Sequence, residues 1–415
     1  MKAVCSAPGK ILWLGGYSIL ERPNVGFVTG VDKRVFVQAT EVETGFCNFK
    51  IPQFSVDLAG KWENGKIVFA GTPSEQELSS VKFVKIAADV CRAYFVSLGI
   101  HFKGIELYSI SDPAFGSGGS KSGLGSSAAA TTAAVAAIFE LHGKPVKDNL
   151  QEIHKAAQIT HSLAQGKIAS GFDVAASCFG GCKYVRYSKE LIPMTASEQE
   201  IANAVSVKWD YEAERIELPR GFLVQIASFA GESASTTSMV KAINAWRDAT
   251  PENKQEYARL FREANDANEK AIGALVRINR KSHENPRDYI DLLSHVEQDP
   301  DSDGPLKEFR IAFEKSREIL KELGTKSGAG IEPDEYTKLI KASEENGAFV
   351  ARLPGAGGGD AIAAICLSST GKERLAQFWK SYSEKKLEHL DVGVSNQGVR
   401  TEREMPTFTC LVARG

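Results

Sequence analysis

Residues 122–130 read SGLGSSAAA, and residues 131–140, TTAAVAAIFE, continue in small and apolar side chains. Glycines and serines at the start disfavour a helix, whereas the alanine-rich stretch after them strongly favours one. The first turn of a helix carries partial positive charge and backbone N–H groups without partners, so it attracts anions. Glycines in front of it allow a sharp turn and a close approach to a ligand. The stretch therefore predicts a helix that begins at an anion site.

The serines of this stretch leave two interpretations open. Ser126 or Ser127 can cap the helix, or can offer a hydroxyl to a phosphate or a metal ion. Lys121, just before the stretch, adds a full positive charge. An ordinary loop followed by a serine N-cap explains the same residues equally well, so the stretch needs support from the rest of the chain.

Two further stretches supply that support. Residues 6–21, SAPGKILWLGGYSILE, place Lys10 after a Pro-Gly turn at the end of the first predicted strand. Residues 352–366, RLPGAGGGDAIAAIC, place four glycines in five residues between two predicted strands, closed by Asp360. Each is compatible with a simple turn when taken alone. Their occurrence together with SGLGSSAAA favours a shared ligand site.

The composition sets broad limits on the protein. Its 415 residues are enough for two domains, and 43% hydrophobic and 25% charged residues with a net charge of −2 give no sign of a nucleic-acid partner. The longest apolar run, near residues 128–139, is too short for a membrane span. Seven scattered cysteines fit reduced thiols, and the opening MKAVCSAPGK lacks the apolar core of a signal peptide. We expect a cytoplasmic protein without nucleic-acid or membrane partners.

The order of predicted elements indicates where the domains divide. The chain begins β-rich, and its composition shifts near residues 190–220, where ELIPMTASEQE (190–200) and DYEAERIELPRG (210–221) predict connecting hairpins. A charged, helical region follows to about residue 345, after which strands return. We therefore expect an N-terminal domain over residues 1–205 and a C-terminal domain over residues 206–415.

The three glycine-rich stretches resemble, in order, the three signature motifs of the GHMP kinases, which phosphorylate small metabolites with ATP. Together with AQGKIASGFDVAAS (164–177), they are most similar to the motifs of the phosphomevalonate kinases within that family. The resemblance implies an α+β GHMP kinase fold. Its N-terminal domain would resemble ribosomal protein S5 domain 2, and its C-terminal domain would be ferredoxin-like, with the helices of about 251–345 packed on it. The active site would lie between the domains.

The resemblance also assigns roles to residues. Lys10 would approach the transferring phosphoryl group, and Asp173 matches the acidic catalytic residue of the family. The resemblance implies a loop around the ATP phosphates, formed by Lys121, Ser122, Gly123, Leu124, Gly125, Ser126, Ser127 and Ala128. Ser126 and Ser127 match the serine that helps to hold Mg²⁺. It also implies acceptor-binding positions at Tyr17, Gln165, Lys167, Ser170, Gly171, Gly355, Ala356, Gly357 and Gly358.

This sequence departs from the family at one position. Other members commonly carry a Mg²⁺-binding glutamate about eleven residues before the catalytic aspartate, whereas His161, Ser162 or Gln165 occupies that neighbourhood here. The metal would then be held by a serine hydroxyl, water and ATP, which Mg²⁺ tolerates.

The activity implied is ATP-dependent phosphorylation of 5-phosphomevalonate to 5-diphosphomevalonate by a monomer or homodimer. A phosphate acceptor is already largely ionised at neutral pH and needs no strong base, so we expect Asp173 mainly to orient Lys10 and the acceptor. A kinase for the 5-hydroxyl of a related compound such as mevalonate 3-phosphate stays open, as does a non-catalytic ligand-sensing protein of the same fold.

Overall fold

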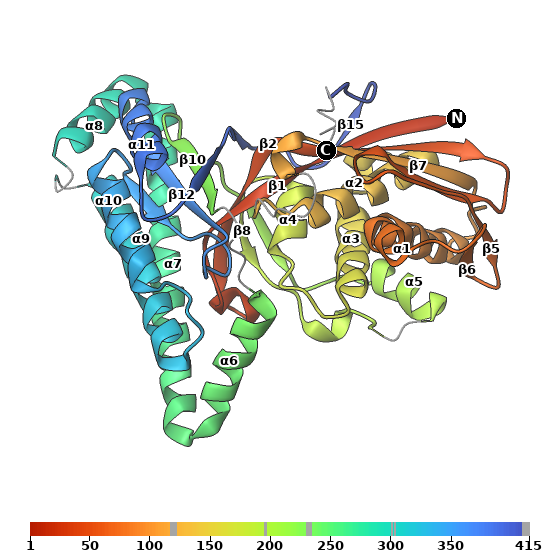
Figure 1. Cartoon of the computed structure of the whole chain (residues 1–415), viewed down its shortest axis with the longest axis horizontal. Helices are drawn as coiled ribbons and strands as arrows, with labels where there is room; N and C mark the ends of the chain where they lie inside the picture. Colours follow the sequence, from red (N-terminus) through yellow and green to blue (C-terminus); the bar gives the residue numbers. More distant parts are fainter. Residues whose placement is uncertain (117–122, 195–196, 230–234, 300–301, 303, 409–415) are drawn as a thin grey trace.

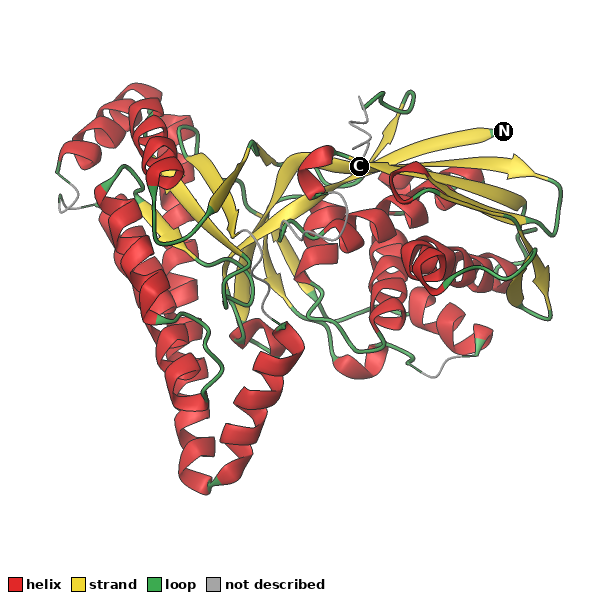
Figure 2. Ribbon diagram, in the orientation of Figure 1, coloured by secondary structure: helices red, strands yellow, loops and turns green. Residues whose placement is uncertain are grey.

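The protein consists of two β-sheets with helices packed against each of them (Figures 1 and 2). The structure is a computed structural model that describes residues 1–116, 123–194, 197–229, 235–299, 302 and 304–408. The larger sheet has the strand order β15-β1-β2-β7-β3-β4, with β8 and β14 paired to β2 and β9 paired to β8. Its strands are β1 (Lys2–Leu14), β2 (Val25–Val42), β3 (Cys47–Ile51), β4 (Val56–Leu58), β7 (Gly104–Ser111), β8 (Cys182–Val185), β9 (Glu212–Arg215), β14 (Val394–Ser395) and β15 (Arg400–Glu402). A separate hairpin is formed by β5 (Gly60–Glu63) and β6 (Lys66–Phe69).

Strand β1 carries Lys10 in its interior rather than beyond its end. The prediction of a Pro-Gly turn that ends the first strand was wrong, because β1 continues through Pro8 and Gly9 to Leu14. The antiparallel register with β2 shifts between Pro8 and Lys10, which pair with Arg34 and Gly30 respectively. A β-bulge thus absorbs the residues that cannot follow a regular ladder and re-aims the strand at this point.

Helices cover one face of the larger sheet (Figure 2). They are α1 (Glu75–Ser97), α2 (Ser126–Leu141), α3 (Leu150–Gln165), α4 (Phe172–Phe179) and α5 (Glu198–Ser206). Helix α2 is the alanine-rich helix predicted after SGLGSS, and its side chains are buried along most of its length. Helix α5 corrects the predicted hairpin at 190–200: Ser197 and Glu200 form a capping box that starts a helix there.

The second sheet has the order β11-β12-β10-β13 and is antiparallel throughout. Its strands are β10 (Leu223–Phe229), β11 (Val350–Arg352), β12 (Ala361–Cys366) and β13 (Leu387–Leu390). Helices precede β11, and α11 (Ser369–Ser381) lies between β12 and β13, so the chain runs β-α-β-β-α-β. This is the ferredoxin-like arrangement, which confirms the predicted fold of the second half.

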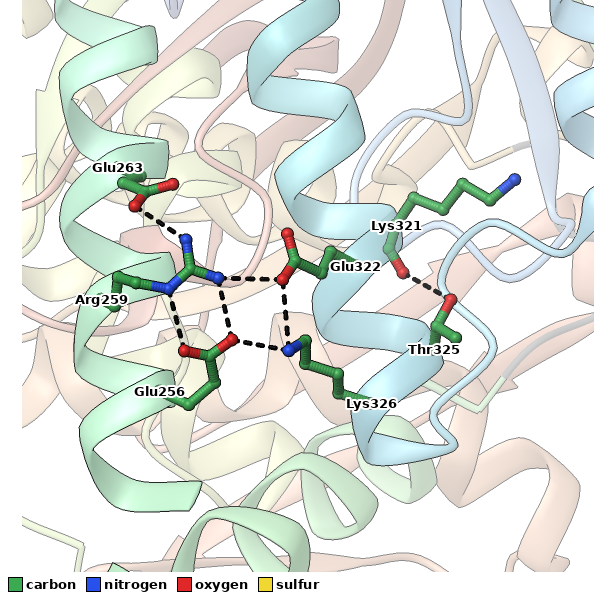
Figure 3. Close-up of polar contacts among 7 residues, drawn as sticks. All are labelled: Glu256, Arg259, Glu263, Lys321, Glu322, Thr325 and Lys326. Carbon is green, nitrogen blue, oxygen red and sulfur yellow. Dashed lines mark hydrogen bonds and ion pairs between the residues drawn. The ribbon is translucent and has the colours of Figure 1, made fainter. Parts of the chain in front are cut away.

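A helical arm projects from the second sheet, as Figure 1 shows. It is formed by α6 (Thr236–Ala249), the 34-residue α7 (Pro251–Glu284) and α9 (Pro305–Ser327). Helices α8 (Pro286–Gln298) and α10 (Asp334–Glu345) complete this half. An ion-pair network joins α7 to α9: Arg259 donates to Glu256, Glu263 and Glu322, and Lys326 donates to Glu256 (Figure 3). The predicted charged helices of about 251–345 are thus observed.

Strands from late in the chain complete the first sheet. β9, β14 and β15 all follow residue 206 in the sequence, yet they pair with β8, β2 and β1 respectively. The division at residues 205 and 206 stays a prediction. Among the residues described, no helix is both long enough and apolar enough to cross a bilayer.

Candidate active site

The first and second glycine-rich stretches lie directly against each other. The Lys10 backbone N–H donates to the Leu124 carbonyl at 2.8 Å, and the Lys10 ammonium donates to the Gly123 carbonyl at 2.6 Å. A β-carbon on Gly9 would lie 2.8 Å from the Leu124 carbonyl oxygen, and one on Gly125 would lie 3.0 Å from Lys10 Cε. Only glycine permits this approach. The predicted convergence of these two motifs is therefore observed.

Helix α2 begins at Ser126 directly after this turn. Its N-cap is Gly125, in the left-handed conformation with φ of 76°, and the cap supplies no side-chain hydrogen bond. Of the two interpretations of Ser126 and Ser127, the N-cap is therefore excluded, because the chain enters α2 with a backbone conformation that glycine tolerates and serine does not. Ser126 and Ser127 are the first two residues of the helix, so their hydroxyls lie near its N terminus. Ser126 is exposed and Ser127 is half-buried.

The remaining residues predicted to bind ATP differ in which of their atoms can contact a nucleotide. Leu124 and Ala128 have buried side chains, so only their backbone can face a ligand. Gly123 lies beside the third motif, since a β-carbon there would be 3.8 Å from the β-carbon of Ala361. Lys121 and Ser122 lie outside the described residues.

Asp173 stands in the first turn of α4. Gly171 caps this helix with φ of 85°, and a β-carbon there would lie 2.5 Å from the Tyr184 hydroxyl. One carboxylate oxygen of Asp173 accepts from the Val174 N–H at 2.9 Å. Burial lowers the pKa of the Lys10 ammonium, and the charges of Asp173 and Asp360 oppose that shift. Two acidic residues therefore help to keep Lys10 charged at the junction of the three motifs.

The third motif joins the site through a glycine turn between β11 and β12. Gly357 has φ of 74°, and a β-carbon there would lie 2.3 Å from the Ile331 carbonyl oxygen. Gly358 donates its N–H to that carbonyl at 2.9 Å, so this amide is used within the protein. Gly355 has open space where a β-carbon would lie. Ala356 accepts a hydrogen bond from the Tyr17 hydroxyl at 2.9 Å, and burial raises the pKa of Tyr17.

The other predicted acceptor-binding residues surround the α3–α4 turn. Gln165 and Lys167 are exposed, and Lys167 donates to the Thr237 hydroxyl at 3.2 Å, which connects this turn to the first residues of α6. The Ser170 carbonyl accepts from the Tyr184 hydroxyl at 3.5 Å. Tyr17 also reaches α6, since its hydroxyl oxygen lies 3.4 Å from the Met239 sulfur. Lys167 and Tyr17 thus connect to α6 of the helical arm, and the acceptor-binding role of these residues stays a prediction.

Two residues gain importance from the structure. Asp360 closes the third motif in sequence and acts electrostatically on both Lys10 and Tyr17. His161, which the sequence leaves as one of three residues near the missing glutamate, is fully buried and lies 3.1 Å from the Ser127 hydroxyl. A buried histidine on the amphipathic helix α3 gives no signal of this contact in the sequence, because its partner is 34 residues away.

The described residues contain no cluster of three His, Cys, Asp or Glu side chains able to bind a metal. Oxygen donors at the junction include the Ser127 hydroxyl and the carboxylate of Asp173, whose side chain is 18% exposed. Both are hard oxygen donors of the kind that Mg²⁺ accepts, and Mg²⁺ usually takes its remaining ligands from water and substrate phosphates. The residues present therefore fit a Mg²⁺–nucleotide complex better than a metal ion alone.

Comparisons with known proteins agree with this geometry. The family model of the GHMP kinases N terminal domain matches residues 82–181, and that of the GHMP kinases C terminal domain matches residues 304–385. A phosphomevalonate kinase of Arabidopsis thaliana, named as peroxisomal, is 27% identical and covers 100% of this chain and 98% of its own length. A phosphomevalonate kinase of Candida albicans is 28% identical over 89% of this chain and 90% of its own.

A solved structure shows the same fold. Streptococcus pneumoniae phosphomevalonate kinase in complex with phosphomevalonate and AMPPNP matches with a TM-score of 0.69 at 16% identity, over 94% of this chain and 99% of that one. Both family domains occur in order, and the three glycine-rich motifs meet around Lys10. This chain belongs to the GHMP kinases.

Proposed function

We propose that the protein transfers the terminal phosphoryl group of ATP to the phosphate of 5-phosphomevalonate, forming 5-diphosphomevalonate and ADP. The observation that carries the proposal is the bridge from Lys10 to the 123–125 turn, beside the N terminus of α2. The names of the relatives, from plant and yeast, support the choice of acceptor. The ligands named for the Streptococcus pneumoniae structure support the pair of substrates.

In this proposal the ATP phosphates lie against the first turn of α2, where backbone N–H groups and the helix dipole favour negative charge. Phosphoryl transfer needs positioning and neutralisation of charge on the phosphate oxygens more than covalent chemistry. The Lys10 ammonium supplies charge to the transferring group. Ser127 and Asp173 would hold Mg²⁺, which when bound would supply further neutralisation of that charge.

The acceptor phosphate attacks without a strong general base, because its second pKa is about 6 and it is largely ionised at neutral pH. Asp173 then serves to orient Lys10 and the acceptor. The acceptor lies near the exposed Lys167 and the Gly355 turn, between the α3–α4 turn and the helical arm. Lys167 pairs with the phosphate that is already present on the acceptor.

A coupled ADP-release assay tests the proposal. Purified protein receives ATP and Mg²⁺ with 5-phosphomevalonate, mevalonate or mevalonate 3-phosphate in parallel. We expect fast turnover with 5-phosphomevalonate and little with the other two. Fast turnover with mevalonate 3-phosphate would identify a hydroxyl kinase instead, and AMPPNP binding without turnover on any acceptor would favour a ligand-sensing protein.

The proposal also covers where and in what form the protein works. We place it in the cytoplasm as a monomer or homodimer, although the Arabidopsis thaliana relative is named as peroxisomal. Cell fractionation and light scattering after gel filtration test these two points separately from catalysis.

A further inference from the structure

The imidazole of His161 lies where four helices of the first half meet. Its ring is fully buried and packs against the Phe83 ring of α1, with centroids 5.6 Å apart and planes inclined by 32°. Its Nε2 lies 3.1 Å from the Ser127 hydroxyl of α2 and 3.0 Å from the Gln165 amide of α3. The Asp173 carboxylate of α4 is 3.8 Å from the same nitrogen. One side chain thus contacts α1, α2 and α4 from its position on α3.

Either tautomer of this ring can bond to Ser127. A hydroxyl both donates and accepts, so Nε2 can pair with the Ser127 hydroxyl whether or not it carries the ring proton. At 3.8 Å the Asp173 oxygen is beyond hydrogen-bond distance and keeps its negative charge for other partners.

The contact with Ser127 has a direct consequence for that hydroxyl. A serine hydroxyl in the first turn of a helix can rotate freely and can bond back to the backbone. A hydrogen bond to a buried ring that is packed against Phe83 selects one orientation. Residues that fix the ligands of a metal or phosphate commonly alter activity by about 10- to 100-fold when they are removed.

We propose that His161 is a positioning residue that holds the Ser127 hydroxyl in place beside Asp173, ready for the Mg²⁺–nucleotide complex. This inference rests on the proposed function, since it assigns His161 a part in the same phosphoryl transfer. It gives His161 a role close to the position where other family members carry a Mg²⁺-binding glutamate and this sequence does not. The structure assigns that role through the α2–α3–α4 junction and not through contact with substrate.

Two substitutions of His161 separate positioning from packing. His161→Leu keeps much of the ring volume and removes the hydrogen bond, whereas His161→Gln extends an amide toward the place of Nε2 and can restore it. We expect His161→Leu to lower kcat by about 10- to 100-fold with KM for the acceptor within about threefold of wild type, and His161→Gln to recover most of the loss. Equal losses in both variants would overturn the proposal.

His154 provides a matched control on the same helix. It is also fully buried on α3, and it contacts Gln158, Phe179 and Tyr211 rather than α2. We expect His154→Leu to lower thermal stability and to affect kcat much less than His161→Leu does. Among the described residues it reaches the site only through Gln158, which donates to the Gly171 carbonyl, and it makes no hydrogen bond with Ser127. If kcat falls as much in His154→Leu as in His161→Leu, the loss in His161→Leu comes from general destabilisation of α3. That result would overturn the proposal.

A binding measurement keeps the inference separate from the proposed reaction. Calorimetric titration with AMPPNP, in Mg²⁺ and in EDTA, reports on the nucleotide site whether or not any acceptor is turned over. We expect His161→Leu to weaken AMPPNP binding several-fold in Mg²⁺ and to have little effect in EDTA. In the combined His161→Leu, Ser127→Ala variant the two losses should not add, because both remove the same interaction. Additive losses, or equal weakening with and without Mg²⁺, would overturn the positioning role even if the wild type is an active kinase.

Discussion

The two glycines at the ends of α2 allow a controlled test of how the phosphate loop holds Lys10. Gly125 caps the N terminus of the helix with φ of 76°, and Gly143 follows its C terminus with φ of 72°. Alanine in the left-handed region costs about 1–2 kcal/mol relative to glycine. A β-carbon at position 125 would lie 3.0 Å from Lys10 Cε and 3.2 Å from its Cγ, whereas one at position 143 meets nothing within 4 Å.

We expect Gly125→Ala and Gly143→Ala to lower the free energy of unfolding by similar amounts, about 1–2 kcal/mol each. Only Gly125→Ala also forces the Lys10 stem to move by a few tenths of an ångström and disturbs its 2.6 Å bond to Gly123. Displacement of a catalytic group by about 1 Å can cost about 100-fold in rate, so for a few tenths of an ångström we expect kcat of Gly125→Ala to fall by about 3- to 10-fold.

Urea unfolding and the ADP-release assay measure these two effects on the same preparations. A Gly125→Ala enzyme with kcat close to that of Gly143→Ala would refute the reasoning, because the Lys10 contact would then have no bearing on the transferring group. A much larger loss of stability in Gly125→Ala alone would instead show that the clash is relieved by distortion of β1.

Three further predictions concern charge. Lys10→Ala should lower kcat by about 10²- to 10³-fold in the ADP-release assay. Asp173→Asn should lower it by clearly less, because a phosphate acceptor needs no base and the asparagine amide oxygen can still bind Mg²⁺; comparable losses would contradict this. Burial raises the pKa of Glu344 from its ordinary value to about 7, so its contribution to stability is present below about pH 4.5 and is lost as the pH rises through 7. Glu344→Gln should therefore be more stable than wild type at pH 8 by about 2 kcal/mol in urea, with no such gain at pH 4.5. Arg352 is buried and donates to the Trp13 carbonyl, so Arg352→Met should lower the free energy of unfolding by about 1–3 kcal/mol, and an unchanged value would mean that this link between the sheets is dispensable.

Local signals in the sequence were enough to predict much of the site. Glycine clusters mark positions that need unusual backbone conformations, and the predicted meeting of the first two motifs is observed between Lys10 and the 123–125 turn. The alternation of Val35, Val37 and Ala39 predicts a strand buried on one face, and all three are buried in β2. The ferredoxin-like order of the second half followed from the family resemblance and is confirmed by the strand pairing.

Features that depend on distant partners could not be predicted. The bulge at Gly9 depends on the register with β2, so a Pro-Gly pair that usually marks a turn lies inside a strand. Gly125 caps α2 because the turn packs on β1. The local preference for serine at an N-cap takes no account of such packing. The contact of His161 with Ser127 arises only when α3 packs beside α2. The sequence thus indicates where an unusual backbone conformation is required more reliably than it indicates which side chains contact each other.

The pairing of β15 with β1 makes the order of synthesis matter for this protein. Residues Val4 to Ser6 are made long before Arg400 to Glu402, which cover that side of the strand. At translation rates of about 5–20 residues per second, the delay is about 20–80 seconds. An uncovered strand edge is a template for pairing with other chains. Nascent chains halted before residue 400 should therefore aggregate or recruit chaperones, whatever the stability of the finished enzyme.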